Sequence, residues 1–537
     1  MLCKVFCACC SGIDAALITV EVDITPGISF YLVGLPDVAV KESQQRIGTA
    51  LNHYGYRIPG RRIVINMAPA NIRKEGSAFD ITIAIGILCA SEQISQGAIS
   101  QETLSKFIIM GELALDGSLR GFAGALPIAA KAAELGFKAC IFPIESAAEC
   151  AELDNITIFG ASNLNDVLNI LRAPEESDKF IISNMFSYNN NITPNGNRAK
   201  YEYDFAAIKG QVIAKTGMEI ACAGNHNIIF VGSPGCGKSM MAKSLPSILP
   251  PLSKKEAMET TKIYSVAGLL QNQYGYIKTR PFRAPHHTAT ISSLTGGGSN
   301  GLPGEISLAH NGVLHLDEFC EFPRSAIEVL RQPMEDNIIQ ISRVKHKYTY
   351  PANFMLVASM NPCPCGYFGS DTTQCRCTSS AIAKYLSRLS GPILDRIDIQ
   401  IFLKPVPPHE LLDLGNDLQA QENSSAIIAE NSATIAARVV EARERQYHRF
   451  ANEDFCTNSS IPASKLDYYC KIGVKERRFI EQIMKKFDLS ARSYSRILKI
   501  SRTIADLDGK DFISLAHISK ALQFRNLDKL LQWRQRG

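Results

Sequence analysis

The segment GSPGCGKS, residues 232–239, decides the fold, and it follows directly on the short apolar run IIFV at 228–231. It satisfies the pattern G-x-x-x-x-G-K-[ST] in the strand–loop–helix setting that this pattern requires. Its glycines allow a turn tight enough for backbone amides to point at phosphate oxygens. The residues expected to bind a nucleoside triphosphate, which we take to be ATP, are Gly232, Ser233, Pro234, Gly235, Cys236, Gly237, Lys238 and Ser239. Of these, Lys238 places its charge against the β and γ phosphates, and the Ser239 hydroxyl ligates Mg²⁺.

A second predicted strand supplies the groups that hydrolysis needs. The sequence GVLHLDE at 312–318 is a buried-strand pattern that ends in two carboxylates. Asp317 is expected to hold Mg²⁺, and Glu318 to polarise the attacking water as a general base. Acidic pairs after apolar runs are common, so the pattern is informative here because the phosphate-binding loop accompanies it.

A third predicted strand, 354–359, ends close to Asn361. An amide at this point is suited to orienting a water molecule against the γ phosphate. Asn361 also stands directly before Pro362, so a turn former without a catalytic role fits the spacing equally well.

The chain has 537 residues, which is too long for one hydrophobic core, and the texture of its sequence changes along its length. A polar, Asn-rich stretch follows the first α/β pattern, and PVPPHE follows the second. We predict four parts: an N-terminal α/β domain at 1–173, a linker at 174–203, an α/β nucleotide-binding core at 204–404 and a C-terminal helical lid at 405–537.

Local patterns place several elements within these parts. The predicted strands of the first part include 15–22 and 63–67, and its predicted helices include 79–90 and 124–135. In the lid, apolar residues recur at helical spacing on one face. They are Ile497, Ile500, Ile504 and Leu507.

Composition is that of an ordinary globular protein, with 46% hydrophobic and 20% charged residues. A net charge of +5 is compatible with a basic surface for nucleic acid but does not argue for one. The 16 cysteines are scattered, and a chain of this size needs no disulfide framework, so we expect a reducing, cytoplasmic setting. Neither a signal peptide nor a membrane-spanning stretch is expected.

Long motifs beyond the nucleotide loop resemble the ComM/YifB family of magnesium-chelatase-like AAA+ proteins over nearly the whole chain. These motifs are LVGLPDVAVKES (32–43), RPFRAPHHTAT (280–290), GGGSNGLPGEISLAHNGVLHLDE (296–318), MNPCPCGY (360–367), YLSRLSGPILDRID (385–398) and LSARSYSRILKISRTIADL (489–507). The resemblance implies an AAA+ core with a parallel sheet. It also implies a homo-hexameric ring that uses ATP to drive helicase and branch-migration work on single-stranded or branched DNA, notably while incoming DNA is integrated.

The same resemblance assigns roles to three further residues. Asn361 falls at the sensor-1 position, and Arg396 falls where related ATPases place an arginine finger that reaches a neighbouring subunit's γ phosphate. Arg492 falls at the sensor-2 position of the lid. A delocalised, permanent charge suits both arginine roles. For each arginine the alternative is an ion pair without a catalytic role.

The N-terminal part resembles the proteolytic domain of Lon, which has a ribosomal-S5-like α/β fold. The resemblance rests on KEGSAFDIT (74–82) and GELALDGSLRGFAGALPIAAK (111–131). Lon uses a Ser-Lys dyad. Here Ala78 stands at the nucleophile position and Leu126 at or beside the lysine position, while Ser77 and Lys131 are displaced along the chain. We therefore expect a non-catalytic domain that supports ring assembly or binds DNA.

Four cysteines form the pattern C-x-C-x₉-C-x-C just after Asn361. They are Cys363, Cys365, Cys375 and Cys377. Four thiolates within a short reach suit tetrahedral Zn²⁺. The C-x-C spacing is tighter than the usual one, and four reduced cysteines without a metal are the alternative. The adjacent His286 and His287 are not expected to be metal ligands.

A β-hairpin with a basic tip is predicted at 338–352, between the strand of Asp317 and the strand before Asn361. Apolar or aromatic residues alternate with polar ones on both arms, and the expected DNA contacts at the tip are Arg343, Lys345 and Lys347. A solvated charged turn is the alternative.

Two functions of different classes follow from these motifs. The first is a DNA helicase or branch-migration motor, and the second is a metal-insertion ATPase subunit of the magnesium-chelatase type. The N-terminal domain and the cysteine pattern favour the first, because chelatase motors lack both. An ATP-dependent protease is a third reading, against which Ala78 and Leu126 count.

Overall fold

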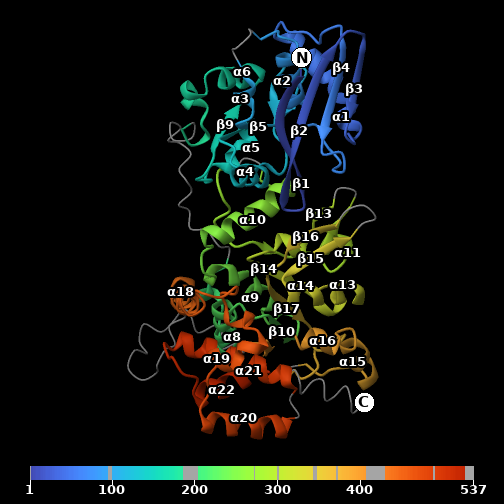
Figure 1. Cartoon of the computed structure of the whole chain (residues 1–537). Helices are drawn as coiled ribbons and strands as arrows, with labels where there is room; N and C mark the ends of the chain where they lie inside the picture. Colours follow the sequence, from blue (N-terminus) through green and yellow to red (C-terminus); the bar gives the residue numbers. More distant parts are fainter. Residues whose placement is uncertain are drawn as a thin grey trace, which may run out of the picture.

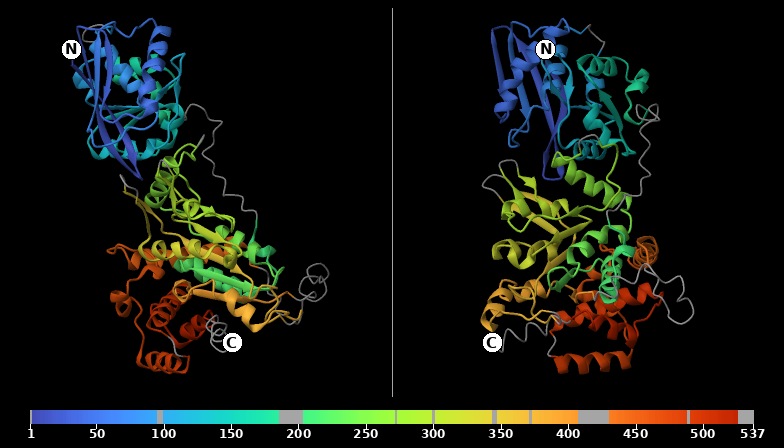
Figure 2. Two further views of the ribbon diagram at one scale, coloured as in Figure 1. Left: turned by 90° about the vertical axis from the view of Figure 1, so that its right-hand side faces the viewer. Right: turned by 180° about the vertical axis from the view of Figure 1, so that it is seen from behind.

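The computed structural model of the chain describes residues 2–94, 99–184, 203–270, 273–298, 301–342, 347–370, 373–406, 430–487 and 490–525. Three regions follow one another along the long axis of the molecule (Figure 1). A sheet-rich N-terminal region lies at one end, a second α/β region lies in the middle, and C-terminal helices lie at the other end. Figure 2 shows the same order from two further sides. Among the described residues, no helix is long and apolar enough to cross a membrane.

The N-terminal region is built on a mixed seven-stranded sheet in the order β3-β4-β2-β1-β5-β8-β9. Its strands are β1 (Leu2–Ser11), β2 (Asp14–Thr25), β3 (Ser29–Val33), β4 (Arg62–Ala68), β5 (Phe107–Ile109), β8 (Ala139–Pro143) and β9 (Thr157–Ala161). Its helices are α1 (Val38–His53), α2 (Asp80–Ala90), α3 (Gln101–Leu104), α4 (Ala125–Glu134), α5 (Ile144–Ala147) and α6 (Leu164–Arg172). A small ribbon is formed by β6 (Glu112–Leu113) and β7 (Leu119–Arg120).

Helix α2 is buried on nearly all sides, which its sequence DITIAIGILCA explains. Gly86 lets this helix approach β2 closely, because a Cβ there would lie 2.6 Å from a methyl carbon of Val22. From Ile18 to Ile24 of β2, every second side chain points into the same core, as a strand half-buried on one face requires.

The middle region contains a five-stranded sheet in the order β11-β14-β17-β10-β18, with every pairing parallel. Its strands are β11 (Phe282–Arg283), β14 (Val313–Leu316), β17 (Met355–Met360), β10 (Ile228–Gly232) and β18 (Ile399–Leu403). On β10, Ile228 and Phe230 belong to one buried cluster, while Ile229 and Val231 belong to another. The strand is therefore covered on both faces, as parallel sheets are.

Helices and two small ribbons surround this sheet. The helices are α8 (Val212–Gly224), α9 (Lys238–Ser244), α10 (Lys254–Val266), α11 (Ile291–Thr295), α12 (Glu305–Leu308), α13 (Arg324–Val329), α14 (Arg331–Asp336), α15 (Ser379–Leu386) and α16 (Gly391–Leu394). The ribbons are β12–β13 (Gly296–Gly297 with Leu302–Pro303) and β15–β16 (Ile338–Ser342 with Lys347–Pro351).

The C-terminal helices share their core with the middle sheet. They are α18 (Ser432–Arg449), α19 (Leu466–Tyr469), α20 (Val474–Phe487), α21 (Ala491–Leu507) and α22 (Leu515–Leu522). Ile497, Ile500 and Ile504 of α21 are buried in the same cluster as Ile228 and Phe230. Arg443 of α18 donates hydrogen bonds to the last carbonyls of α8, at Cys222 and Ala223. Such a cation at a helix C-terminus is favourable.

The N-terminal region contacts the middle region through α10. The backbone amide of Gly124 donates to Ser265 O, and the Ser265 hydroxyl donates to Glu149 Oε1 at 2.6 Å. Burial raises the pKa of Glu149 to about 7. The turn between β1 and β2 lies against the β15–β16 ribbon, since a Cβ on Gly12 would come within 3.4 Å of Thr349 O.

The sequence-based elements agree closely with these bounds. The strands expected at 15–22 and 63–67 are β2 and β4, and the helices expected at 79–90 and 124–135 are α2 and α4. The class is mixed α/β with a parallel sheet in the middle region and a helical C-terminal region. The segment predicted as a linker starts as part of the N-terminal region. Its first residues form two 3-10 turns, and Ile182 is only 2% exposed.

Candidate functional site

The loop GSPGCGKS connects β10 to α9 at the carboxyl edge of the parallel sheet, where α/β proteins bind phosphates. Gly235 and Gly237 have φ values of +81° and +90°, which side chains with a Cβ adopt only under strain. A Cβ on Gly232 would lie 2.7 Å from Cys236 Sγ, so the loop closes tightly on itself.

The ammonium group of Lys238 lies inside this loop. Its Nζ donates to Gly232 O at 2.7 Å, to Ser233 O at 3.0 Å and to Asn361 Oδ1 at 3.1 Å. Burial lowers the pKa of Lys238 below its usual range. Asn361 follows the carboxyl end of β17, the strand next to β10, so the sheet brings two residues 123 positions apart into contact.

Asp317 receives hydrogen bonds from the neighbouring strand β17 and from α9. Ser239 Oγ donates to its Oδ2 at 2.7 Å, and Ser359 Oγ donates to its Oδ1. Burial acts to raise the pKa of Asp317, but these two hydroxyls, together with His315 and the amide of Glu318, hold the pKa below the usual value. The carboxylate is therefore ionised and sits beside the hydroxyl with which it was expected to share a cation.

Behind Asp317, His315 is buried in β14. Its Nε2 lies 3.4 Å from Ser359 Oγ, and burial lowers the pKa of His315 to about 4. The imidazole is neutral near pH 7 and supports the hydroxyl that in turn binds Asp317.

Glu318 has a left-handed backbone with φ of +52°, and its amide donates to Asp317 Oδ1 at 2.9 Å. A non-glycine residue in this region is strained, and such strain is concentrated at functional sites. Its carboxylate lies 3.0 Å from the Nδ1 atom of His287, from the loop after β11. Sequence reasoning missed this contact, because the histidine pair gave no sign of a partner 31 positions ahead.

Arg396 and Arg492 lie elsewhere, in a cavity of about 640 Å³ that is also lined by Arg496 and Lys499. Arg396 is 7% exposed, donates to Pro392 O at 2.7 Å and forms an ion pair with Glu335. Its Nε has no hydrogen-bond partner among the described residues. Arg492 is largely exposed, with its guanidinium 4.0 Å from the Asp395 carboxylate.

This cavity lies at the opposite edge of the sheet from the phosphate-binding loop. Arg396 precedes the amino end of β18, and its carbonyl accepts from Asn227, which precedes the amino end of β10. The loop follows the carboxyl end of β10. At about 3.3 Å per residue, the five residues of β10 separate the two places by roughly 15 Å. The structure thus brings Lys238, Ser239, Asp317, Glu318 and Asn361 together and holds both arginines apart from them.

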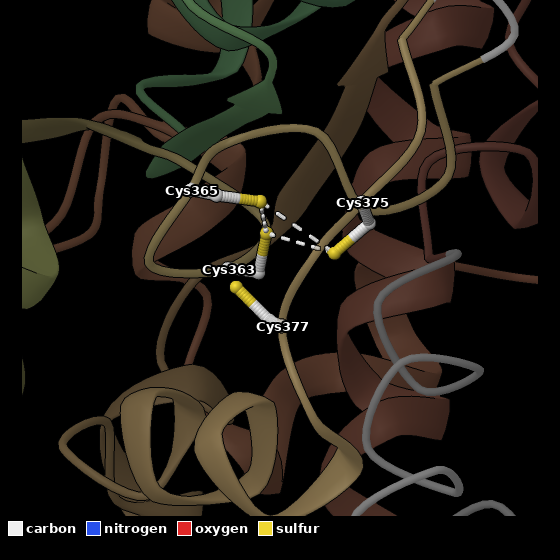
Figure 3. Close-up of side chains that lie close together, drawn as sticks. All are labelled: Cys363, Cys365, Cys375 and Cys377. Carbon is white, nitrogen blue, oxygen red and sulfur yellow. Dashed lines mark hydrogen bonds between the residues drawn. The ribbon is translucent and has the colours of Figure 1, made fainter.

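The four clustered cysteines converge on one point (Figure 3). Cys363 and Cys365 come from the turn after β17, and Cys375 and Cys377 lie shortly before α15. All four sulfur atoms lie within 4.8 Å of one another, and Cys363 is fully buried.

The predicted hairpin is present as the antiparallel ribbon β15–β16, in which Ser342 pairs with Lys347. Lys347 is exposed at the end of the ribbon. Arg343 and Lys345 lie outside the described residues. Tyr348, next to Lys347, lines a cavity of about 190 Å³ together with Cys10 and Ala78 of the N-terminal region.

Comparison with known proteins matches all three regions to magnesium chelatase families. Residues 204–411 match "Magnesium chelatase, subunit ChlI", residues 20–146 match "Subunit ChlI of Mg-chelatase", and residues 429–525 match "Magnesium chelatase, subunit ChlI C-terminal".

Similarity to individual proteins differs sharply in its extent. The competence protein ComM of Haemophilus influenzae is 40% identical over 97% of each chain. The uncharacterized protein YifB of Salmonella typhimurium is 38% identical over 97% of this chain and 96% of its own length. The magnesium-chelatase 67 kDa subunit of Heliobacterium mobile is 25% identical over only 40% of this chain and 36% of its own length.

Proposed function

We propose that this chain, which belongs to the ComM/YifB family of magnesium-chelatase-like AAA+ proteins, is an ATP-hydrolysing motor that acts on DNA. The observation that carries the ATPase assignment is the convergence of four groups at one edge of the sheet. Lys238 contacts Asn361, and Ser239 contacts Asp317. Lys238 is suited to binding phosphates and Asn361 to orienting water, while Ser239 and Asp317 are suited to binding Mg²⁺.

The oxygen atoms of Ser239 and Asp317 fit a hard divalent cation. They lie 2.7 Å apart, and the depressed pKa of Asp317 keeps its carboxylate charged. Magnesium prefers oxygen ligands and keeps several waters. When bound, it supplies charge that stabilises the triphosphate during transfer. Ser359 and His315 hold the Asp317 side chain in place for this task.

Hydrolysis then depends on the chain's own side chains. Lys238 leaves the loop carbonyls for the β and γ phosphates, and Asn361 orients the attacking water. Glu318 accepts the proton of that water, and His287 fixes the direction of the Glu318 carboxylate. The strained left-handed backbone at Glu318 also supports a functional role, because such strain is concentrated at functional sites.

Arg396 and Arg492 act on the nucleotide of a neighbouring subunit. This part of the proposal rests on their distance from their own loop, because a strand's length separates them from Lys238. A guanidinium that completes the site from outside needs a ring or a row of subunits. The proposed assembly is a homo-hexamer, in which Arg396 exchanges Glu335 for the neighbour's γ phosphate.

DNA is the proposed substrate of the motor, single-stranded or branched. The family relative named for competence supports a role in uptake or recombination. The β15–β16 ribbon connects the strand of Asp317 with the strand before Asn361, so its position is tied to both parts of the nucleotide site. The proposed DNA contacts are Arg343, Lys345 and Lys347, which would bind phosphates without reading sequence.

The N-terminal region is proposed to be a Lon-like domain without protease activity. Besides Ala78 and Leu126 at the expected catalytic positions, the displaced candidates are engaged elsewhere: Ser77 hydrogen-bonds Glu112, and Lys131 pairs with Glu134. The domain lies against the β15–β16 ribbon through Gly12 and Tyr348. This contact supports a role for the domain in holding the ribbon, and Ala78 and Leu126 argue against peptide cleavage.

A metal-insertion ATPase subunit is the second candidate, favoured by the matches to chelatase families. The two functions are separated by one measurement with the purified full-length chain and no porphyrin partner. The motor hypothesis predicts that single-stranded or branched DNA stimulates ATP hydrolysis and that branched substrates are unwound. ATP hydrolysis that is indifferent to every DNA tested would favour the chelatase alternative.

The DNA grip has its own test. Changing Arg343, Lys345 and Lys347 together to Ala should leave ATP binding intact but weaken DNA binding. It should also lower the slope of log affinity against log salt by about one unit per lost phosphate contact. The matched control changes three exposed lysines of the C-terminal helix α20, Lys475, Lys485 and Lys486, to Ala. An unchanged salt slope in the ribbon variant would show that DNA binds to another surface of the protein.

A further inference from the structure

The four cysteines come from two short segments that the fold brings together beside the nucleotide site. Cys363 Sγ lies 3.3 Å from Cys365 Sγ and 3.7 Å from Cys375 Sγ, and Cys365 Sγ lies 3.6 Å from Cys375 Sγ. In Figure 3 the four sulfur atoms point inward from opposite sides of the loop. No other group of three or more metal-ligating side chains within such reach occurs among the residues described.

These separations fit a single metal ion rather than a disulfide or an iron–sulfur cage. A disulfide requires about 2.05 Å between sulfur atoms. A tetrahedral zinc ion with Zn–S bonds of about 2.3 Å places its ligand sulfurs about 3.8 Å apart. The cysteines around a four-iron cluster surround a cage of eight atoms, so their sulfur atoms lie much farther apart than those of this chain.

The backbone around the sulfurs is arranged for negative charge. Amides of Gly366 and Phe368 donate to Cys363 Sγ, and amides of Tyr367 and Arg376 donate to Cys365 Sγ. Hydrogen bonds of this kind stabilise thiolates, the form in which cysteine binds metals.

We propose that Cys363, Cys365, Cys375 and Cys377 bind one structural Zn²⁺, and that this ion braces the phosphate-binding loop and Asn361. Two contacts between the cysteine loop and the nucleotide site support this bracing role. A Cβ on Gly366 would lie 2.6 Å from Pro234 Cδ, so the cysteine loop touches the phosphate-binding loop directly. Asn361 stands two residues before Cys363, and its side chain receives the hydrogen bond from Lys238.

The second pair of cysteines extends the brace toward Arg396. Cys377 is followed by Thr378, which caps α15 by accepting from the amide of Ala381. After α15, Arg388 donates to Cys320 O at 2.8 Å, and α16 then leads to Arg396. One ion would therefore connect the segment of Asn361 with the segment that presents the arginine. This second role rests on the proposed ATPase function, whereas the binding of zinc does not.

The metal site is tested by elemental analysis of the full-length chain purified from zinc-supplied cells. We expect about one zinc per chain in the wild type and near none in Cys375→Ser/Cys377→Ser. Cys89→Ser/Cys456→Ser, which changes two cysteines outside the cluster, should keep its zinc. Replacement by Co²⁺ should give the intense visible bands of tetrahedral thiolate coordination. A metal-free wild type whose four thiols react at once with a thiol reagent would overturn the site, and stoichiometric iron would overturn zinc.

The brace is tested by nucleotide affinity and turnover in Cys365→Ser, whose side chain is partly exposed. We expect ATP affinity to change by less than about threefold and turnover to fall at least about tenfold, with far-UV circular dichroism unchanged. Loss of zinc with wild-type turnover would overturn the brace while leaving the metal site. If Lys238→Ala and Glu318→Gln also keep wild-type turnover, the ATPase assignment itself has failed, and the metal analysis still decides the site.

Discussion

The loop around Lys238 and the cavity around Arg396 are both lined by charged groups, but they are organised differently. At the loop, Lys238, Ser239, Asp317 and Asn361 contact one another directly and face the carboxyl edge of the sheet. At the cavity, Arg396 and Arg492 are paired with Glu335 and Asp395 at the amino edge. The first region holds the groups proposed to bind the triphosphate and to activate the attacking water. The second region holds two arginines that lie a strand's length from the phosphate-binding loop of the same chain. On this difference rests the proposal that each nucleotide site is shared between two neighbouring chains.

The largest effect is expected from Lys238→Ala. The variant loses the cation that lies within the loop and contacts three of its neighbours. ATP affinity should fall by about 100-fold or more, since a charge-assisted contact to phosphate is lost. Isothermal titration calorimetry measures this directly, with Lys243→Ala on the same helix as control. Wild-type ATP affinity in Lys238→Ala would show that this loop does not bind the nucleotide, and the contrast between the two regions would then have no functional meaning.

Glu318→Gln should separate binding from chemistry within the first region. The amide keeps the size of the side chain but cannot accept a proton from water. Turnover should fall by about 10²- to 10⁴-fold while ATP affinity stays unchanged. Glu321→Gln, three residues further on and part of an exposed ion pair, is the matched control. A near wild-type rate in Glu318→Gln contradicts the general-base role.

Acid should affect the two regions at different pH values. Burial lowers the pKa of His315 to about 4, so the unfolded chain takes up a proton near pH 6.5 while the folded chain does not. The contribution of His315 to the free energy of unfolding should therefore drop by about 3 kcal/mol between pH 6.5 and 4, which is seen as the difference between the wild type and a variant without this histidine. At the cavity, Arg496 and His226 outweigh burial and hold the pKa of Asp398 well below its usual range. Its stabilisation is kept throughout this window and is lost only in stronger acid.

Urea unfolding of the wild type and of His315→Gln, measured from pH 7 to 4, checks the sign and size of this contribution. His315→Gln should flatten the pH dependence, whereas His53→Gln, at an exposed position of α1, should not. If the free energy of unfolding depends on pH equally in the wild type and in His315→Gln, the buried histidine is not the source of the acid sensitivity.

The smallest effect is expected from His287→Ala. Removal of the contact to Glu318 leaves the base present but less well directed. Turnover should fall by roughly three- to tenfold at unchanged ATP affinity, and His287→Asn, which keeps a donor, should recover part of the loss. His286→Ala is the control, because the neighbouring ring instead bonds Thr288. A larger loss in His286→Ala than in His287→Ala would contradict the positioning role.

Much of the fold and the first region could be predicted from sequence because the signals are local. The apolar run before GSPGCGKS is β10, the run before Asp317 is β14, and the spacing of Ile497, Ile500 and Ile504 gives the buried face of α21. The alternation in 338–352 gives the β15–β16 ribbon. Each of these patterns is set by which face of one element must be buried.

Contacts between distant segments could not be predicted in this way. The approach of His287 to Glu318 depends on the order β11-β14-β17 in the sheet, which periodicity does not encode. The same holds for the pairing of Arg396 with Glu335 and for the shared cavity of the arginines. The convergence of the four sulfur atoms depends on where the returning loop meets the turn after β17. The spacing of the cysteines alone therefore could not decide between a zinc site and four reduced thiols.

The most direct test of the central claim is a mixing experiment with Lys238→Ala and Arg396→Ala, each of which should be inactive alone. If Arg396 acts on a neighbouring subunit, equal mixing should place an intact loop beside an intact arginine at about one quarter of the interfaces. ATP hydrolysis should then recover to a corresponding fraction of the wild-type rate. Arg445→Ala, which removes an exposed ion pair with Glu441 on α18, is the control and should be active before mixing. If the mixture remains as inactive as its components although subunits exchange, or if Arg396→Ala hydrolyses ATP at full rate as a monomer, the division of the site between two chains is contradicted.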